Sequence, residues 1–201
     1  STDIKQKRNV YCVTLAVRLH LGKKQIINRN TMQDFQSLCQ NRRSIRKYTT
    51  QAVEQEKIDY ILRCALMSPS SKRTNPWEFV VVREEAKLRA MENCRTYGSG
   101  MFQTATAAIV VTLDSSLTDM WMADGSIAAA HILLAAADLG LGACWCQVYQ
   151  RDGAQELIKN LCAIPEDKTV LCVISLGYKD EERKQYDLEK LNYAKIHNEQ
   201  W

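Results

Sequence analysis

The segment from Met120 to Leu139 constrains the fold of this chain most, because it is apolar on nearly every side. It combines helical spacing of Ile127, Ile132 and Leu134 with a run of alanines. A helix that is apolar around its circumference belongs in a core or at a subunit interface rather than on a wetted surface. The sequence therefore predicts that this helix is covered on more than one side.

From Met32 onward the sequence pattern predicts helices alternating with short apolar strands. The chain is long enough for these elements to bury one sizeable core. Predicted strands cover residues 78–83, 106–113, 143–148 and 169–176, and predicted helices cover residues 33–40, 54–67, 84–94, 120–139 and 152–161. The segment from Tyr178 is charged and too poor in apolar residues for a core of its own. We expect it to wrap over the domain or over a partner subunit. No apolar run is long enough to span a bilayer, so we expect no membrane partner.

Residues 1–31 differ from the rest in charge and pattern. They hold seven Lys and Arg against one acid, Asp3, which leaves 20 basic and 22 acidic residues from Met32 onward. A body without basic excess argues against a nucleic-acid partner. We therefore divide the chain into a basic extension at 1–31, which could be non-native, and a domain at 32–201. The alternatives are an integral extra strand, since the extension alternates apolar and polar residues, or a nucleic-acid binder acting through it.

Eight cysteines raise the question of disulfides or a metal site. None forms a C-x-x-C pair, and only Cys144 and Cys146 are close, on one face of a predicted strand. Most lie among aliphatic residues, where a free thiol behaves as a small hydrophobe. We expect free structural thiols, no metal, and a reducing, cytoplasmic location.

Two polar segments carry the candidate chemistry. The first, Arg42-Arg43-Ser44-Ile45-Arg46-Lys47-Tyr48, groups three guanidinium forks around a hydroxyl, which suits a phosphate. The second, Ser68-Pro69-Ser70-Ser71-Lys72-Arg73-Thr74-Asn75-Pro76-Trp77, is a turn with small and amide side chains that leads into an apolar strand. Such a turn can read the edge of a flat polar heterocycle.

In this order the two segments resemble the nitroreductase family of FMN-dependent, NAD(P)H-using flavin reductases, and the resemblance runs from about Met32 to Trp201. It implies that the FMN phosphate is held by Arg42, Arg43, Ser44 and Arg46. It implies further that the flavin ring lies against Pro69, Ser70, Ser71, Arg73 and Asn75. Arg73 departs from the Asn that is usual in the family, and a cation there favours an anionic reduced flavin.

Two later segments extend the resemblance. Gly140-Leu141-Gly142 and the strand after it resemble the region where backbone groups approach the flavin, here those of Cys146, Gln147 and Val148. Near the C-terminus many members have Arg where this chain has Gln185. The phosphate contact on that side is therefore assigned to Arg183 or Lys184.

The resemblance implies an α+β fold, a three-layer α/β/α sandwich with a mainly antiparallel sheet, in a domain-exchanged homodimer with FMN at the interface. It also implies tightly bound FMN, NAD(P)H as a transient reductant, and ping-pong electron transfer to a small-molecule acceptor such as a nitroaromatic, quinone or flavin. The chain has neither G-x-G-x-x-G behind a strand nor a P-loop, which agrees with a nucleotide that binds only over another cofactor. The alternatives are a flavin-binding or storage protein without turnover, and a specialised enoyl or dehalogenating reductase on the same fold.

Overall fold

A computed structural model describes residues 34–201 of the chain, and their centre is a four-stranded sheet. The strands are β1 (Trp77–Val82), β2 (Ala107–Leu113), β3 (Gly142–Gln147) and β4 (Thr169–Gly177). They lie in the order β1-β2-β4-β3, and each neighbouring pair is antiparallel. β2 and β4 are buried almost throughout because they are central, whereas β1 and β3 form the edges. The predicted antiparallel sheet is confirmed.

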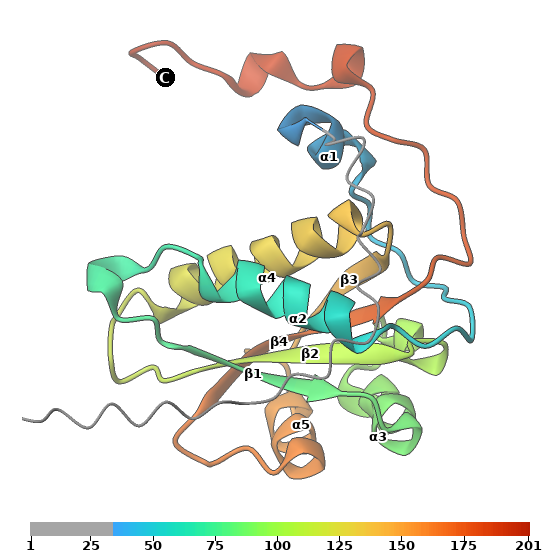
Figure 1. The fold of residues 1–201 in the computed structure, drawn as a ribbon. Coiled ribbons are helices and arrows are strands. Elements are labelled where there is room, and N and C mark those ends of the chain that lie inside the picture. The colour runs from blue at the N-terminus through green and yellow to red at the C-terminus, as the bar shows by residue number, and fades with distance from the viewer. Residues whose placement is uncertain (1–33) are drawn as a thin grey trace, which may run out of the picture. The chain divides into compact units, whose positions relative to one another are not determined.

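Helices cover both faces of this sheet, so the three-layer α+β architecture is confirmed (Figure 1). On one face lie α2 (Gln55–Leu66) and α4 (Trp121–Asp138), whose buried residues form one core with the sheet. On the other lie α3 (Glu85–Ala90) and α5 (Ala154–Cys162), which share the second core. The remaining elements are α1 (Phe35–Asn41) and the 3₁₀ turns η1 (Ser71–Arg73), η2 (Met91–Cys94), η3 (Gly100–Gln103), η4 (Leu188–Lys190) and η5 (Tyr193–Lys195). The single helix predicted for 84–94 is thus α3 followed by η2, since the last turn tightens.

α4 uses one side for the core, and the described residues leave part of its other side exposed. Asp124, Gly125, Ala128, Ala129, Ile132, Ala135 and Ala136 are buried. The approach to the sheet is close, because a Cβ on Gly125 would lie 2.6 Å from a methyl of Leu113. On the opposite side Met122 is 40% exposed and Ile127 is 37% exposed. The apolar circumference thus corresponds to a core face and an exposed apolar face.

The predicted phosphate-binding segment docks on the sheet through two glycines. Gly142 of β3 and Gly177 of β4 are cross-strand partners. A Cβ on Gly142 would meet Ile45 at 2.7 Å, and one on Gly177 would meet Tyr48 at 2.9 Å. The glycines therefore make a flat platform for these two side chains. The Tyr48 hydroxyl donates to the Ile45 carbonyl and lies 2.7 Å from Ser175 Oγ; burial raises its pKa, which keeps it protonated.

The cysteines within the described residues are free thiols, most of them partly or fully buried. Cys144 and Cys146 lie in the same core on one face of β3, as predicted. Between Asp34 and Trp201 no group of three or more His, Cys, Asp or Glu is arranged to hold a metal ion. No helix in the same range has the length and apolarity to cross a membrane. The predictions for residues 1–31 lie outside the described residues.

Candidate functional site

The basic segment 42–46 lies along the open edge of β3. Ser44 forms a parallel bridge with Ala143, and the Ile45 N–H donates to the Ala143 carbonyl at 3.1 Å. Arg46 is exposed, and Arg42, Arg43 and Ser44 are half-buried. The side chains of this segment therefore start from a backbone that the sheet fixes.

The C-terminal segment after β4 comes back to the same place. The Arg43 guanidinium donates to the Lys184 carbonyl and lies over the Tyr186 ring, 4.5 Å from its centroid. Arg42 Nη2 lies 3.5 Å from the Tyr186 hydroxyl. Backbone bonds join Asp180 to Lys47 and Tyr186 to Gln40. Hydrogen bonds and a cation–π contact thus join two segments that are some 140 residues apart in the chain.

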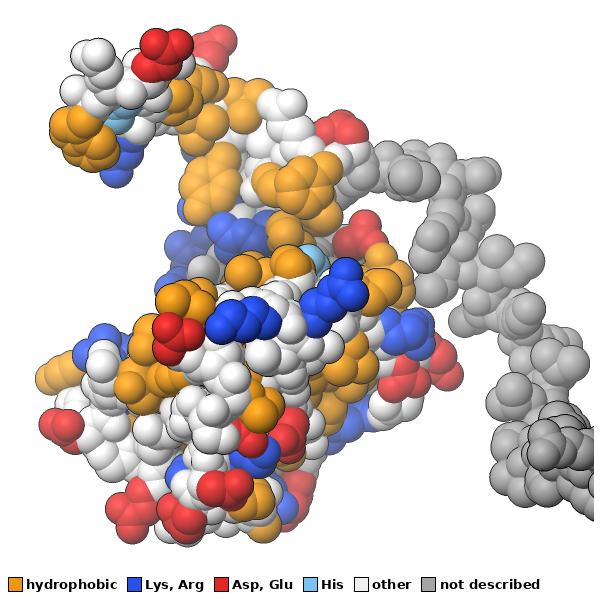
Figure 2. All heavy atoms as spheres, turned by 90° about the vertical axis from the view of Figure 1, so that its left-hand side faces the viewer, with side chains coloured by type: hydrophobic (Ala, Val, Ile, Leu, Met, Phe, Trp, Pro, Cys, Tyr) orange, Lys and Arg blue, Asp and Glu red, His pale blue; other side chains and the backbone are white. Residues whose placement is uncertain are grey.

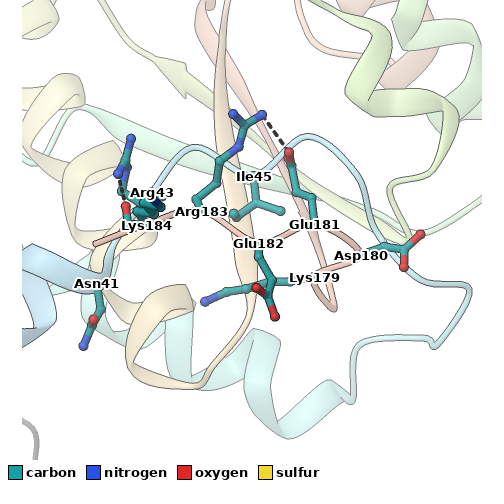
Figure 3. A pocket seen from close by; sticks show the side chains of 9 residues that line it. All are labelled: Asn41, Arg43, Ile45, Lys179, Asp180, Glu181, Glu182, Arg183 and Lys184. Atoms are coloured by element: carbon teal, nitrogen blue, oxygen red, sulfur yellow. Dashed lines mark hydrogen bonds and ion pairs between the residues drawn. The ribbon is translucent and has the colours of Figure 1, made fainter. Parts of the chain in front are cut away.

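Between these two segments is an open pocket of about 910 Å³ (Figure 3). It is lined by Asn41, Arg43, Ile45, Lys179, Asp180, Glu181, Glu182, Arg183 and Lys184. Three predicted phosphate ligands, Arg43, Arg183 and Lys184, share its wall. Arginine forks and a lysine ammonium together suit a phosphate dianion, because each adds a charge-assisted hydrogen bond.

Glu181 is the best-connected side chain of this pocket. Its Oε1 accepts the N–H groups of Arg46 (2.5 Å) and Lys47 (3.3 Å), and its Oε2 lies 2.7 Å from Arg183 Nη2. The side chain is only 14% exposed. Burial alone would raise its pKa, but the Arg46 N–H and the Arg183 guanidinium outweigh that effect and lower the pKa of Glu181.

The second predicted segment forms a tight loop before β1, at the end of the sheet where β3 finishes but at the other edge. Lys72, Arg73 and Asn75 have positive φ angles of 51°, 57° and 45°. Non-glycine residues adopt a positive φ only when contacts with their surroundings stabilise it. Ser70 Oγ supplies part of it, accepting the Asn75 N–H at 3.0 Å and donating to Asn75 Oδ1 at 2.8 Å.

Asp124, in the first turn of α4, also fixes this loop. Its Oδ1 accepts the Ser71 N–H at 2.9 Å, and the residue is 4% exposed. Pro76 and Trp77 are buried behind the loop, so Trp77 is a core residue as expected. Ser70, Ser71, Arg73 and Asn75 consequently belong to one preformed turn, next to Pro69.

β3 presents an open strand edge next to the phosphate-type pocket. Ala143 and Gln147 are four residues apart, which is about 13 Å along a strand. The Ala143 carbonyl points away from β4. Because backbone groups alternate in direction along a strand, the backbone N–H and C=O groups of Trp145 and Gln147 point the same way. Beyond the bridge at Ser44, no other described strand pairs with this edge. An elongated ligand with a phosphate at one end could lie along it.

The far end of β3 is closed by polar and aromatic contacts. Gln147 accepts from the Trp145 indole N–H at 2.9 Å and donates to the Tyr149 carbonyl at 3.1 Å. The Tyr149 ring meets Trp121 of α4 edge to face, with centroids 4.9 Å apart. Gln147 is half-buried, whereas the neighbouring Val148 side chain is fully buried.

The prediction for Cys146 requires a distinction between side chain and backbone. Its thiol is fully buried on the α3/α5 side of the sheet, 3.7 Å from the Cys94 sulfur. A ligand at the strand edge therefore cannot reach the thiol, and the backbone N–H of Cys146 points toward β4, so Gln147 is the residue of the predicted three whose backbone N–H points outward. The sequence missed Glu181, Asp124 and Tyr186, because their partners are far away in the chain.

Comparison with known proteins gives matches over most of the chain. The model of the Nitroreductase family matches residues 39–95 and 88–178. A protein of Archaeoglobus fulgidus named "Putative NADH dehydrogenase/NAD(P)H nitroreductase" is 39% identical over 175 residues, covering 85% of this chain and all of its own length. A protein of the same name from Methanothermobacter thermautotrophicus is 42% identical over 171 residues, covering 84% of this chain and 88% of its own. The structure of an FMN-dependent nitroreductase from Clostridium difficile superposes with a TM-score of 0.79 at 44% identity, covering 82% of this chain and 98% of that one.

Proposed function

This chain belongs to the nitroreductase family, and from that premise we propose that it is an FMN-dependent oxidoreductase that takes electrons from NAD(P)H. The acceptors we propose are small molecules with low-lying empty orbitals: nitroaromatics, quinones or free flavins. The two substrates would use one site in turn, in a ping-pong cycle. A cytoplasmic location stays a prediction.

One observation carries this proposal: two remote chain segments build a pocket with four cationic and three acidic side chains, at the start of the open edge of β3. Arg43, Arg183 and Lys184 share the pocket, and the Ser70–Asn75 turn is a separate preformed polar turn before β1, fixed to Asp124 of α4. The four residues from Ala143 to Gln147 span about 13 Å of this edge, a length that suits an FMN lying along it with its phosphate at the Ser44 end. Arginine, lysine and amide donors of these kinds fit the phosphate and the ring of FMN.

FMN, when bound, supplies the two-electron chemistry, and the residues of this chain position it. Arg42, Arg43, Ser44 and Arg46, with Arg183 or Lys184, would hold the phosphate. Pro69, Ser70, Ser71, Arg73 and Asn75 would face the ring, and the Asn75 amide can both donate and accept at its edge. Among Cys146, Gln147 and Val148, which the family resemblance assigns to the flavin, the outward N–H of Gln147 would orient the redox-active edge, while the buried strand β4 excludes water from behind.

We further propose a homodimer whose subunits cover each other's exposed apolar surface. The C-terminal segment carries exposed Tyr186, Leu191, Tyr193, Ile196 and Trp201 (Figure 2). α4 contributes exposed Met122 and Ile127. Exposed aromatic and aliphatic side chains in this number are typical of a surface that a partner covers. In such a dimer the FMN would be shared between the subunits.

Purification and turnover test the proposed function directly. We expect a yellow protein that releases FMN rather than FAD, and that oxidises NADH or NADPH only when a nitroaromatic, quinone or flavin is present. Parallel lines in double-reciprocal plots would support the ping-pong cycle. Bound FMN without oxidation of either nucleotide would indicate a storage protein instead. Turnover confined to enoyl or halogenated acceptors would indicate a specialised reductase.

Replacing Arg46 by alanine tests the phosphate assignment. Loss of one charge-assisted contact, worth about 1.5–3 kcal/mol, should weaken FMN binding by roughly 10- to 150-fold. Fluorescence titration of the FMN-free protein measures this. Lys47→Ala is the matched control, because it removes a neighbouring exposed cation that we do not assign to the phosphate. Equal affinities of the two variants would contradict the assignment.

A further inference from the structure

Glu181 presents an electrostatic contradiction to a phosphate-binding pocket. Its carboxylate is in the wall of the pocket that holds Arg43, Arg183 and Lys184. A fixed negative charge there repels a phosphate dianion and, taken alone, weakens its binding. If Glu181 contributed nothing but its negative charge, it would reduce the affinity of the pocket for a phosphate.

The bonds of Glu181 point to a different role. One carboxylate oxygen accepts the consecutive N–H groups of Arg46 and Lys47, and the other holds Arg183 at 2.7 Å. The side chain therefore ties the basic segment before Tyr48 to the segment after β4. These are the two segments from which the phosphate ligands come.

We propose that Glu181 is a positioning residue of the FMN phosphate site, which fixes Arg183 and the backbone of Arg46 and Lys47 in the arrangement that receives the phosphate. This inference rests on the proposed function and adds a residue to it. Glu181 touches neither the flavin ring nor the reacting atoms, and it acts through the cations it holds. The stabilisation of the cation arrangement outweighs the repulsion.

Glu182 provides the matched control. It lines the same pocket and carries the same charge, yet it is exposed and has no hydrogen bond or ion pair within the described part of the chain. In Figure 3 Glu181 reaches toward Arg183, whereas Glu182 projects the other way. Alanine at either position removes one negative charge from the pocket, but only Glu181→Ala removes the bonds.

The test compares FMN with riboflavin, which has the same ring and no phosphate. Affinities of both are measured by flavin fluorescence for the FMN-free wild type, Glu181→Ala, Glu181→Gln and Glu182→Ala. We expect Glu181→Ala to bind FMN at least about tenfold more weakly, with riboflavin changed less than about twofold. Glu181→Gln should lie in between, because an amide oxygen still accepts from the backbone but cannot pair with Arg183. Glu182→Ala should bind FMN as tightly as wild type or more tightly.

Two results would overturn the inference. If Glu181→Ala binds FMN as tightly as Glu182→Ala, the carboxylate acts only as a repelling charge. If Glu181→Ala loses FMN and riboflavin in the same proportion, the residue serves folding and not the phosphate site. Failure of the proposed function is distinct from both, because the wild type itself would then show no preference for FMN over riboflavin.

Discussion

Valine in place of Gly177 is expected to destabilise the protein and to disorganise the predicted phosphate site together. A Cβ at this position would lie 2.9 Å from three atoms of Tyr48, including its own Cβ, so the tyrosine cannot escape by a small rotation. Overpacking of this kind costs about 1–3 kcal/mol in unfolding free energy. For a chain of this size that lowers the melting temperature by roughly 2–12 °C.

The coupling to the site follows from what Tyr48 does. Its hydroxyl donates to the Ile45 carbonyl, and its N–H donates to Thr104 Oγ1 at 3.2 Å. Displacing Tyr48 therefore moves the backbone that carries Ser44 and Arg46. We expect Gly177→Val to weaken FMN binding by more than tenfold, as measured by fluorescence titration.

Gly100→Val is the control for this experiment. A Cβ on Gly100 meets nothing within 4 Å, so the larger side chain should leave both stability and FMN affinity nearly unchanged. The effect of Gly177→Val should also shrink in a Tyr48→Ala background, because the clashing partner is then gone. Full additivity of the two substitutions would show that Tyr48 is not the cause.

The layout of this fold could be predicted from sequence because each core element has a clear local pattern. The predicted helix over 120–139 is α4 at Trp121–Asp138, and the predicted strand over 169–176 is β4 at Thr169–Gly177. The differences are one or two residues at the ends, where fraying and capping decide. The antiparallel pairing of the strands came from the family resemblance and not from periodicity, and the strand order came only from the structure.

The site was predictable only in part, because its geometry depends on contacts between distant segments. Arg43, Arg183 and Lys184 were all candidates, and the structure brings them to one pocket. Glu181 was not, since nothing local distinguishes it from its neighbour Glu182. The positive φ of Lys72 and Arg73 was equally hidden, because non-glycine residues rarely adopt it without support from elsewhere in the fold.

Glutamate in place of Ile127 is expected to break the proposed homodimer. Ile127 lies on the side of α4 that the core does not use and is 37% exposed in the single chain. A second subunit covering this face would bury the new carboxylate without a partner, at a cost of about 3–5 kcal/mol. The dimer dissociation constant should therefore rise on the order of 100-fold or more, giving monomers or aggregates.

Sedimentation and flavin content together decide this prediction. Since the FMN would be shared between subunits, Ile127→Glu should lose flavin as it loses the dimer. Tyr97→Glu places the same charge on another exposed apolar residue, 84% exposed, between the turns η2 and η3 on the opposite side of the sheet, and should remain dimeric and yellow. A wild type that is monomeric with tightly bound FMN would refute the dimer itself. An Ile127→Glu variant that stays dimeric with full flavin would show that the interface does not include this face of α4. The interface would then involve the other exposed apolar residues, chiefly those of the C-terminal segment.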